Sequence, residues 1–327
     1  MIHGGNVWQG SDPDAWLDFS ASLRPEGPPE WVEKAIAQSL SCARYYPDPS
    51  MRDARRGLAA YAGVEESRIL PAAGGIAAID LALRLRQGPV RIPEPTFGEY
   101  ARRAALLNRD IRNGGPWGEA GETILLCNPN NPTGGAVSRE ETLAMHRRSA
   151  ARGGEMIVDE AFIDYCPEIS VRGDVCDTLT AVGSLTKLLC IPGVRLGYVC
   201  ASPENVETLE RLALPWQLGF AASAVASALP EHLDEIRRDA EINAKRRQRL
   251  AQGLRALGAR VQPSRANFLL CRFDRPMGRI VEELKARHIL VRPCASFGLS
   301  DRWLRLAVRT EEENQRLIEE LIQCLKL

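Results

Sequence analysis

The sequence lacks an excess of charge of either sign. Its 42 Lys and Arg residues face 42 Asp and Glu residues, so the formal net charge is zero. A general electrostatic grip on nucleic acid or anionic lipid needs a basic excess, and its absence argues against both kinds of partner. No stretch approaches the roughly 18 consecutive apolar residues of a membrane span, and the first residues lack the basic and apolar regions of a signal peptide. We therefore expect a cytoplasmic protein that acts on a small molecule.

Histidine and paired cysteine are also scarce. The chain has four histidines, and none stands at metal-ligand spacing from another potential ligand, so we expect no protein-bound metal. The nine cysteines are odd in number and scattered, without a C-x-x-C pair. In a reducing cytoplasm this pattern indicates buried free thiols rather than disulfides.

The chain does have length and a strong alternating pattern. Its 327 residues suffice for about two domains. Between residues 69 and 200, short apolar runs alternate with helical stretches, and the runs lie at 69–71, 90–92, 124–127, 156–158, 179–182 and 196–200. This alternation predicts an α/β fold with a mostly parallel central sheet between helices. Because Lys187 leaves no room for a helix before Gly197–Cys200, we expect that strand to be antiparallel.

Three parts are expected along the chain. Residues 1–27 show no helical period, which indicates an extended arm that joins the small domain and the substrate site. Residues 28–228 carry the sheet and would form the large domain, with one helix after Pro28-Pro29 and another from a Ser50 cap to about residue 61. Residues 229–327 combine helical spacing with strands at 267–272 and 303–308, which predicts a small α+β domain.

The segment Asn128-Pro-Asn-Asn-Pro-Thr-Gly134 directly follows the apolar run at 124–127. Two prolines and a glycine enforce a fixed turn at the carboxyl end of a strand, where open α/β sheets bind ligands. The Asn131 side chain can offer an amide donor to a ring oxygen of such a ligand. A tight turn without a ligand is the alternative that this segment alone leaves open.

Asp159 follows the next buried run, in Val158-Asp-Glu-Ala-Phe162. A carboxylate at this position is costly unless it meets a positive partner. A protonated pyridine nitrogen would be such a partner. A structural cap at the strand end is the alternative.

Lys187 and Arg195 lie in two further short segments, Ser184-Leu-Thr-Lys187 and Pro192-Gly-Val-Arg-Leu-Gly197. A lysine whose pKa is lowered by burial and neighbouring cations can form a Schiff base with a carbonyl compound. An arginine eight residues later suits a bidentate phosphate contact. Most lysines lie on the surface, so the interpretation depends on the order and spacing of all four segments.

In this order the four segments resemble the fold-type I enzymes that depend on pyridoxal 5'-phosphate (PLP), of the aminotransferase class I/II family, over essentially the whole chain. The resemblance implies that Lys187 binds PLP covalently, that Asp159 pairs with the ring nitrogen and that Asn131 bonds the phenolic oxygen. Phe97 would stack on the ring. The phosphate ligands would be Ser184, Arg195, backbone amides near Ala73 and Gly74, and Tyr46. Tyr46 resembles the tyrosine that reaches the neighbouring subunit's phosphate, which implies a homodimer with shared active sites.

The start of the chain, with the Tyr46-Pro-Asp48 element, narrows the resemblance to the threonine-phosphate decarboxylases of cobalamin biosynthesis, whose nearest relatives are histidinol-phosphate aminotransferases. The N-terminal segments His3-Gly-Gly-Asn6 and Asp18-Phe-Ser-Ala-Ser22 carry this likeness. Arg305 would clamp a substrate carboxylate, and Arg292 would contact a second anionic group. The implied substrate-binding residues are His3, Gly4, Gly5, Asn6, Ser22, Asn131, Arg292 and Arg305.

The implied reaction is PLP-dependent decarboxylation of L-threonine O-3-phosphate to aminopropanol O-phosphate, with serine phosphate as another possible substrate. An aminotransferase of the histidinol-phosphate type is the alternative enzyme, and a non-catalytic PLP-fold binding protein is a third hypothesis. Three departures from the family bear on this choice. Ala72-Ala-Gly-Gly75 stands where relatives commonly have Gly-Asn-Gly, Phe162 replaces a tyrosine, and Ser22 stands where relatives often have Asn. The change at Ser22 borders the substrate, so it concerns substrate identity more than cofactor binding.

Overall fold

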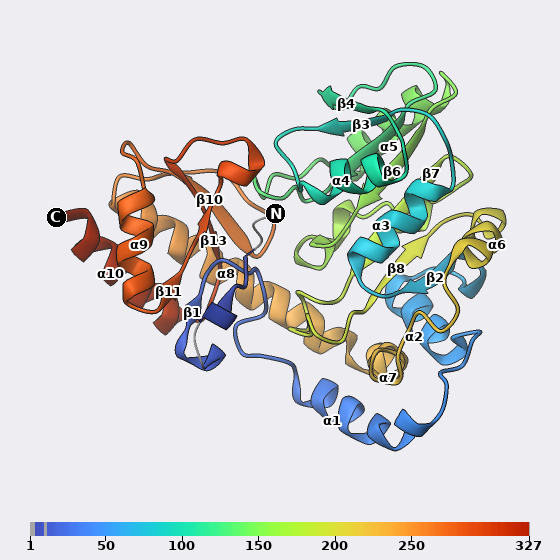
Figure 1. Ribbon diagram of the computed structural model, residues 1–327, viewed down its shortest axis with the longest axis horizontal. Helices are drawn as coiled ribbons and strands as arrows, with labels where there is room; N and C mark the ends of the chain where they lie inside the picture. Colours follow the sequence, from blue (N-terminus) through green and yellow to red (C-terminus); the bar gives the residue numbers. More distant parts are fainter. Residues whose placement is uncertain (1–3, 10–11, 327) are drawn as a thin grey trace.

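The structure, a computed structural model, describes residues 4–9 and 12–326. Its larger part is built on a seven-stranded sheet in the order β2-β8-β7-β6-β5-β3-β4 (Figure 1). The strands are β2 (Ile69–Ala72), β3 (Val90–Pro93), β4 (Ile111–Gly114), β5 (Thr123–Cys127), β6 (Glu155–Asp159), β7 (Leu179–Ser184) and β8 (Gly197–Cys200). β8 is antiparallel to both neighbours, whereas the other pairs are parallel. The predicted fold class and the antiparallel strand are confirmed.

Helices cover both faces of this sheet because alternate strand residues point to opposite sides. In β5, Ile124 and Leu126 join one core with α2, α5 and α7, whereas Leu125 joins a second core with α3, α4 and α6. The helices are α1 (Glu30–Ser39), α2 (Arg52–Ala62), α3 (Gly75–Arg84), α4 (Glu99–Leu106), α5 (Arg139–Ala150), α6 (Pro203–Leu212) and α7 (Phe220–Ala228). The carboxyl ends of the strands remain open between the two layers, where ligands bind in such sheets.

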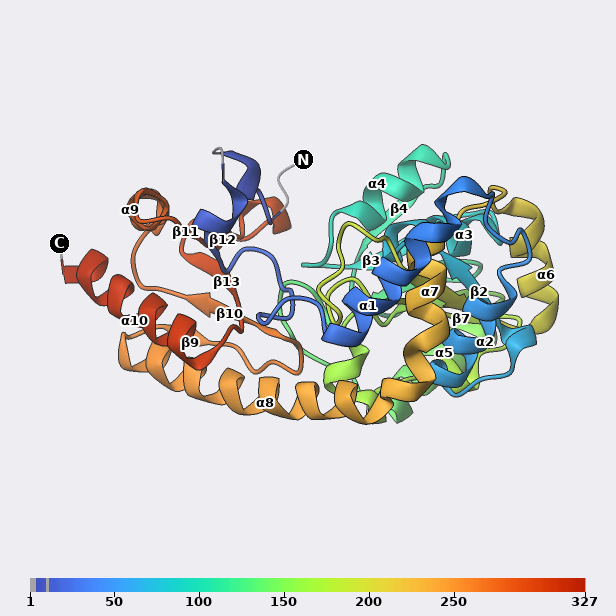
Figure 2. The same cartoon turned by 90° about the horizontal axis from the view of Figure 1, so that it is seen from below.

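The C-terminal part contains a four-stranded antiparallel sheet in the order β12-β13-β10-β9. Its strands are β9 (Arg260–Val261), β10 (Phe268–Arg272), β12 (Arg292–Pro293) and β13 (Trp303–Ala307), and its helices are α9 (Gly278–Ala286) and α10 (Glu311–Lys326). The long helix α8 (Leu233–Ala256) runs beneath both parts (Figure 2). In the arm, β1 (Leu17–Asp18) pairs in parallel with β11 (Ile289–Leu290), so the arm joins this C-terminal part.

The predicted cap of α2 is wrong. The helix begins behind Met51, which has a left-handed φ of 49°, and Ser50 makes no cap. Asp48 takes this role instead, because its carboxylate accepts the backbone N–H groups of Ser50 and Arg52 at 3.0 and 3.2 Å. The sequence Tyr46-Pro-Asp48 therefore also stabilises the turn before α2.

Three other features differ from the prediction. β4 has no apolar run, because it lies at the sheet edge and three of its four residues are exposed. The arm is not extended throughout, since it forms 3-10 turns at Val7–Gln9 and Pro13–Ala15. All nine cysteines are free, but Cys42 is exposed, and Cys176 and Cys190 are only partly buried. Within the described part of the chain, no helix has both the length and the apolarity needed to cross a membrane.

Candidate active site

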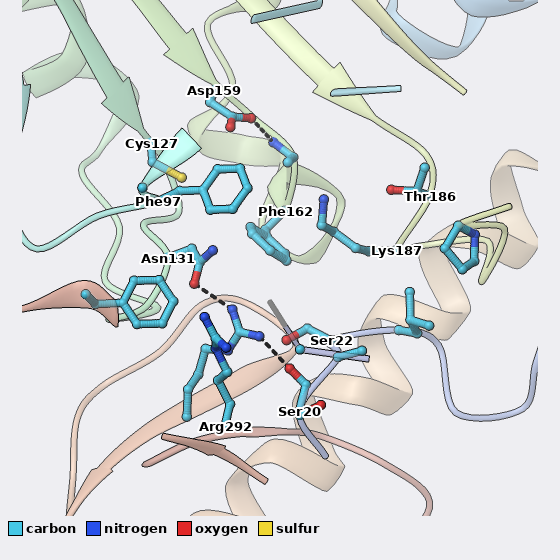
Figure 3. A pocket seen from close by; sticks show the side chains of 18 of the residues that line it. Ser20, Ser22, Phe97, Cys127, Asn131, Asp159, Phe162, Thr186, Lys187 and Arg292 are labelled. Carbon is cyan, nitrogen blue, oxygen red and sulfur yellow. Dashed lines mark hydrogen bonds between the residues drawn. The ribbon is translucent and has the colours of Figure 1, made fainter. Parts of the chain in front are cut away.

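A cavity of about 350 Å³ opens where β5, β6 and β7 end, between the two parts of the chain (Figure 3). A volume of this size is typical of small-molecule sites. The arm and the small sheet close its other side. The predicted site residues that line the cavity are Gly4, Ser22, Phe97, Asn131, Asp159, Lys187, Arg195, Arg292 and Arg305.

Lys187 and Asp159 enter the cavity from neighbouring parallel strands. Asp159 ends β6, and Lys187 follows β7 by three residues. Burial lowers the pKa of Lys187 although the charge of Asp159 opposes this, and Arg305 and Arg195 lower it further. Burial raises the pKa of Asp159, against a hydrogen bond from Tyr100 and the charge of Lys187. A lowered pKa favours the neutral, nucleophilic form of the lysine amine.

Asn131 is oriented by its turn and by Arg305. The side chain of Asn128 clamps the turn, since its Nδ2 donates to the Val137 carbonyl and its Oδ1 accepts the Val137 N–H, both at 2.9 Å. Arg305 Nη1 donates to Asn131 Oδ1 at 2.6 Å. A guanidinium can only donate, so this contact fixes which way the amide faces. Asn131 Nδ2 is then the atom that can donate to a ligand oxygen.

Phe97 is positioned by a link between two loops. Thr96 Oγ1 donates to Asn130 Oδ1 at 2.7 Å, and Asn130 Nδ2 donates to the Pro95 carbonyl at 2.9 Å. The rings of Phe97 and Tyr100 meet edge to face, with centroids 5.5 Å apart. The loop that carries Asn131 thus also holds the aromatic wall of the cavity.

Two glycines, Gly74 and Gly75, form the start of α3. We call this part of the backbone the glycine cradle. Gly74 precedes the helix with φ +85°, and no side chain caps it. A Cβ on Gly74 would stand 2.7 Å from Arg195 Nη2, and a Cβ on Gly75 would stand 3.1 Å from Ser184 Cβ. The Arg195 guanidinium and Ser184 therefore approach the helix start, a setting that suits a phosphate. Arg195 has a left-handed φ of 62°, a strain found mainly at functional sites.

The backbone contacts expected at Ala73 and Gly74 lie beside this cradle rather than on the cavity wall. The Gly74 N–H already donates to the Ala72 carbonyl at 2.8 Å. The first backbone N–H group of α3 that has no partner inside the helix is that of Gly75. The helix start lies beside the predicted residues, and the binding of a phosphate by its backbone amides stays a prediction.

The N-terminal arm crosses the cavity and links its two walls. The Arg24 N–H donates to the Lys187 carbonyl at 3.0 Å, and the Ser20 carbonyl accepts from Arg305 Nη2 at 2.7 Å. Ser22 Oγ is buried and has no hydrogen-bond partner within the described residues. The arm therefore connects the backbone at Lys187 with Arg305 and leaves one hydroxyl for a ligand.

The glycine segment of the arm lies only in part at the cavity. Gly4 lines it, and a Cβ there would come within 2.1 Å of the Ser20 carbonyl oxygen, so only glycine fits. The Gly5 N–H donates to Ser20 Oγ at 2.8 Å. Gly5 and Asn6 do not line the cavity, and His3 lies outside the described residues.

Arg292 and Arg305 are direct cross-strand partners on β12 and β13, so their side chains extend from the same face. Both are buried, and their Cζ atoms lie 5.3 and 5.9 Å from the centre of the Phe297 ring. Arg292 Nη2 donates to Ser296 Oγ at 2.8 Å. Both hydrogen bonds of Arg305 go to neutral oxygens, and its buried Nε has no partner within the described residues. Burial, with the charge of Arg292, lowers the pKa of Arg305 to about 10, as expected for a buried cation beside another cation.

Tyr46 does not line the cavity of its own chain. It is 81% exposed, and its ring lies 4.8 Å from that of Trp216. It lines a second hollow of about 650 Å³ beside α1 and α7. Its predicted role in a neighbouring subunit thus remains a prediction, and Tyr46 makes no contribution to the cavity of its own chain.

Sequence reasoning missed several residues that line the cavity, namely Ser20, Tyr100, Cys127, Thr186, Ser296 and Phe297. Tyr100 follows Phe97 by three residues at the start of α4, and this helical spacing is the signal that could have found it. Ser296 and Phe297 belong to the segment 291–297, from which only Arg292 was selected. Ser20 acts through its backbone carbonyl, which residue identity does not reveal.

The fold and this site define a PLP-dependent enzyme. The chain belongs to the aminotransferase class I and II family, whose model matches residues 116–321. It is 32% identical to the threonine-phosphate decarboxylase of Salmonella typhimurium, over 99% of this chain and 96% of that protein. It is 28% identical to histidinol-phosphate aminotransferase 2 of Archaeoglobus fulgidus, over 93% of this chain and 92% of that protein.

Solved structures agree on the fold. The L-threonine-O-3-phosphate decarboxylase from Porphyromonas gingivalis superposes with a TM-score of 0.84 at 24% identity, over 94% of this chain and 99% of that one. The histidinol-phosphate aminotransferase from Clostridium acetobutylicum superposes with a TM-score of 0.86 at 23% identity, over the same shares. The predicted family and its cofactor, PLP, are confirmed. The residues fit that group: a glycine cradle with an arginine for the phosphate, a buried carboxylate, an oriented amide donor and a lysine of lowered pKa.

Substitution of Gly74 tests the cradle. Gly74→Ala is expected to weaken PLP binding by about tenfold or more, because the added methyl displaces Arg195 and a left-handed residue costs a further ~1–2 kcal/mol. The matched control is Gly63→Ala, at φ +69° with no atom within 4 Å of the added methyl. Cofactor titration of both apoproteins measures the effect. Equal PLP affinity in the two variants would show that the cradle does not hold the phosphate.

Proposed function

We propose that this chain decarboxylates a short phosphorylated amino acid, with L-threonine O-3-phosphate as the first candidate and L-serine O-phosphate as the second. The observation that carries the proposal is the side-by-side pair of Arg292 and Arg305. Two adjacent guanidiniums suit a ligand with two anionic groups close together. A phosphorylated three- or four-carbon amino acid has a carboxylate and a phosphate at such a spacing.

The charge of the cavity supports this substrate class. Among the described residues that line it, the cations are Lys187, Arg195, Arg292 and Arg305, and the anion is Asp159. Arg195 and Ser184 would bind the cofactor phosphate, and the two small-domain arginines would bind the substrate. Ser22 Oγ adds a buried hydroxyl without a partner in the described chain.

The bound cofactor supplies an electron sink for the negative charge that remains at the substrate α-carbon when a bond breaks. Lys187 would hold the cofactor, Asp159 would keep its ring nitrogen protonated, and Asn131 Nδ2 would donate to its phenolic oxygen. Phe97 would cover one ring face. All four residues line the cavity, which supports these roles.

The substrate would be oriented from the opposite wall. Arg305 would bind the carboxylate and Arg292 the phosphate, and both are held in place by neighbouring oxygens. The bond that breaks is the one held perpendicular to the ring, so this two-point grip would select it. The substrate amine would first displace Lys187, and after CO₂ leaves the freed Lys187 Nζ would donate a proton to the α-carbon. The return of Lys187 to its covalent attachment would then release aminopropanol phosphate.

An aminotransferase of the histidinol-phosphate type is the second candidate. Its supporting observation is the similarity to the Archaeoglobus fulgidus protein. Lys187 would then carry a proton away from the α-carbon instead of supplying one. The amino donor glutamate also carries two anionic groups, so the arginine pair alone does not separate the two reactions.

We also propose that two copies of the chain associate through the surface around Tyr46. Large exposed apolar residues lie there, including Tyr45, Leu214 and Trp216. Such patches mark interaction sites. In the dimer Tyr46 would reach the cofactor phosphate of its neighbour.

A substrate panel tests the proposed reaction. Threonine phosphate, serine phosphate, unphosphorylated threonine and histidinol phosphate are each incubated with holoprotein, with and without 2-oxoglutarate. We expect CO₂ release from threonine phosphate that does not depend on 2-oxoglutarate. Unphosphorylated threonine should react at least about 100-fold more slowly, because it lacks the phosphate that Arg292 would bind. A 2-oxoglutarate requirement without CO₂ release would assign the aminotransferase instead.

A further inference from the structure

Tyr100 is buried against Asp159 and has no place in the roles described so far. It lies in the first turn of α4, is fully buried, and its hydroxyl donates to Asp159 Oδ2 at 2.5 Å. The other oxygen, Oδ1, accepts the Ala161 N–H at 2.9 Å. Two of the roughly four lone-pair positions of this carboxylate are therefore filled by fixed donors. The remaining positions can face the ring nitrogen.

We propose that Tyr100 is a positioning residue that keeps the proton of the Asp159–cofactor pair on the ring nitrogen. A hydrogen bond to a carboxylate stabilises its charged form and makes the acid stronger. The stronger acid gives up its proton to the ring nitrogen more completely. The electron sink on which the chemistry depends is then set partly by a tyrosine that does not touch the substrate.

The other titratable groups near Asp159 do not take the place of Tyr100 as a hydrogen-bond donor to its carboxylate. The titratable and charged groups that face it are Tyr100 from α4, Cys127 from β5 and Lys187 after β7. Burial raises the pKa of Cys127 to about 12, and its thiol donates to the Pro129 carbonyl at 3.3 Å, so it stays neutral. Lys187 loses its ordinary ammonium charge when it binds the cofactor. Among the described residues, Tyr100 is then the side chain that donates to the carboxylate in the holoprotein.

Tyr100 also connects Asp159, the proposed partner of the ring nitrogen, with Phe97, the residue proposed to stack on the ring. Its ring meets Phe97 edge to face, and Phe97 lies three residues earlier. Figure 3 shows Asp159, Cys127 and Phe97 together at one end of the cavity and Arg292 at the other. Burial raises the pKa of the Tyr100 hydroxyl well above its ordinary value, so it remains a donor at every working pH. The inference holds for a decarboxylase and for an aminotransferase, and it rests on the proposed role of Asp159.

The test uses holoprotein loaded with PLP that carries ¹⁵N in the ring, because the ¹⁵N chemical shift reports protonation of that nitrogen. Asp159→Asn is expected to move the resonance to the unprotonated position, which checks the role of Asp159 itself. Tyr100→Phe is expected to move it part of the way. The matched control is Tyr61→Phe, which removes another buried tyrosine that donates to a carboxylate, that of Asp164. The control should leave the resonance in the wild-type position.

The apoprotein gives a second readout that does not depend on activity. The infrared carboxyl band of Asp159, assigned by its loss in Asp159→Asn, gives the pKa of that group. We expect Tyr100→Phe to raise it by about one to two pH units, the effect of one lost hydrogen bond to a charged group. If this variant does not fold, 3-fluorotyrosine at position 100, a more acidic and stronger donor, should lower the pKa instead.

The outcomes separate the two claims. An unmoved resonance in Tyr100→Phe, beside a displaced one in Asp159→Asn, would overturn the role of Tyr100 alone. An unmoved resonance in Asp159→Asn would overturn the role of Asp159 and this inference with it. Equal shifts in Tyr100→Phe and Tyr61→Phe would show a general structural effect and would also contradict the inference.

Discussion

Lys187→Ala is expected to abolish turnover and to remove the absorbance of the lysine-bound cofactor. Loss of a positioned proton donor alone costs about 10²- to 10⁴-fold in rate, and the variant also loses the covalent attachment of PLP. The chain has five lysines, so borohydride reduction followed by peptide mapping can locate the attached residue directly. We expect the reduced cofactor on the peptide that contains Lys187.

The matched control is Lys245→Ala. Lys245 is exposed on α8, far from the cavity lining, and its replacement should leave the spectrum and the rate unchanged. Cofactor attached to a lysine other than Lys187, or full turnover in Lys187→Ala, would contradict the assignment of Lys187 as the residue that binds PLP.

Arg305→Gln is expected to lower kcat/KM for threonine phosphate by about 30- to 3,000-fold. Truncating one partner of a buried, hydrogen-bonded charge pair costs about 2–5 kcal/mol, and each 1.4 kcal/mol is tenfold. Arg305→Lys should recover only part of this loss, because an ammonium lacks the planar fork that binds a carboxylate through two bonds. Steady-state kinetics of both variants measure the effect.

Arg305→Gln should also shift the pH dependence of the rate at which the apoprotein captures PLP. The charge of Arg305 helps to lower the pKa of Lys187, and the amine must be neutral to capture the cofactor. In the wild-type apoprotein the capture rate should therefore level off at a lower pH than for an ordinary lysine. In Arg305→Gln the pKa rises and the profile moves to higher pH. Arg272→Gln, on the adjacent strand β10, is the control.

An unchanged kcat/KM in Arg305→Gln would show that the substrate carboxylate is bound elsewhere.

The reactive side chains at the carboxyl ends of the strands could be predicted from the sequence. Asp159 ends β6, Lys187 follows β7 and Asn131 follows β5. Parallel strands end at one edge of a sheet, so residues that follow successive strands share that edge whatever the packing beneath it. The apolar runs that give the strands are also local, which is why the sheet and its antiparallel strand β8 were predictable.

Residues that act through tertiary contacts could not be predicted. The role of Ser20 depends on a backbone carbonyl that meets Arg305 from the far end of the chain. Tyr100 depends on a buried contact with Asp159 across 59 residues. The cap of α2 depends on Met51 adopting a left-handed φ, which allows Asp48 rather than Ser50 to bond the helix start. Side-chain type gives no indication of such contacts, because they are set by the packing of distant segments.

The most direct test of the proposed reaction follows the substrate carboxyl carbon. L-Threonine O-3-phosphate labelled with ¹³C at that carbon is incubated with holoprotein without a keto acid, and ¹³C NMR is recorded. We predict that the label appears as CO₂ and bicarbonate while the amino group stays on an unlabelled aminopropanol phosphate. Label that remains in the organic product, with turnover only after 2-oxoglutarate is added, would contradict decarboxylation.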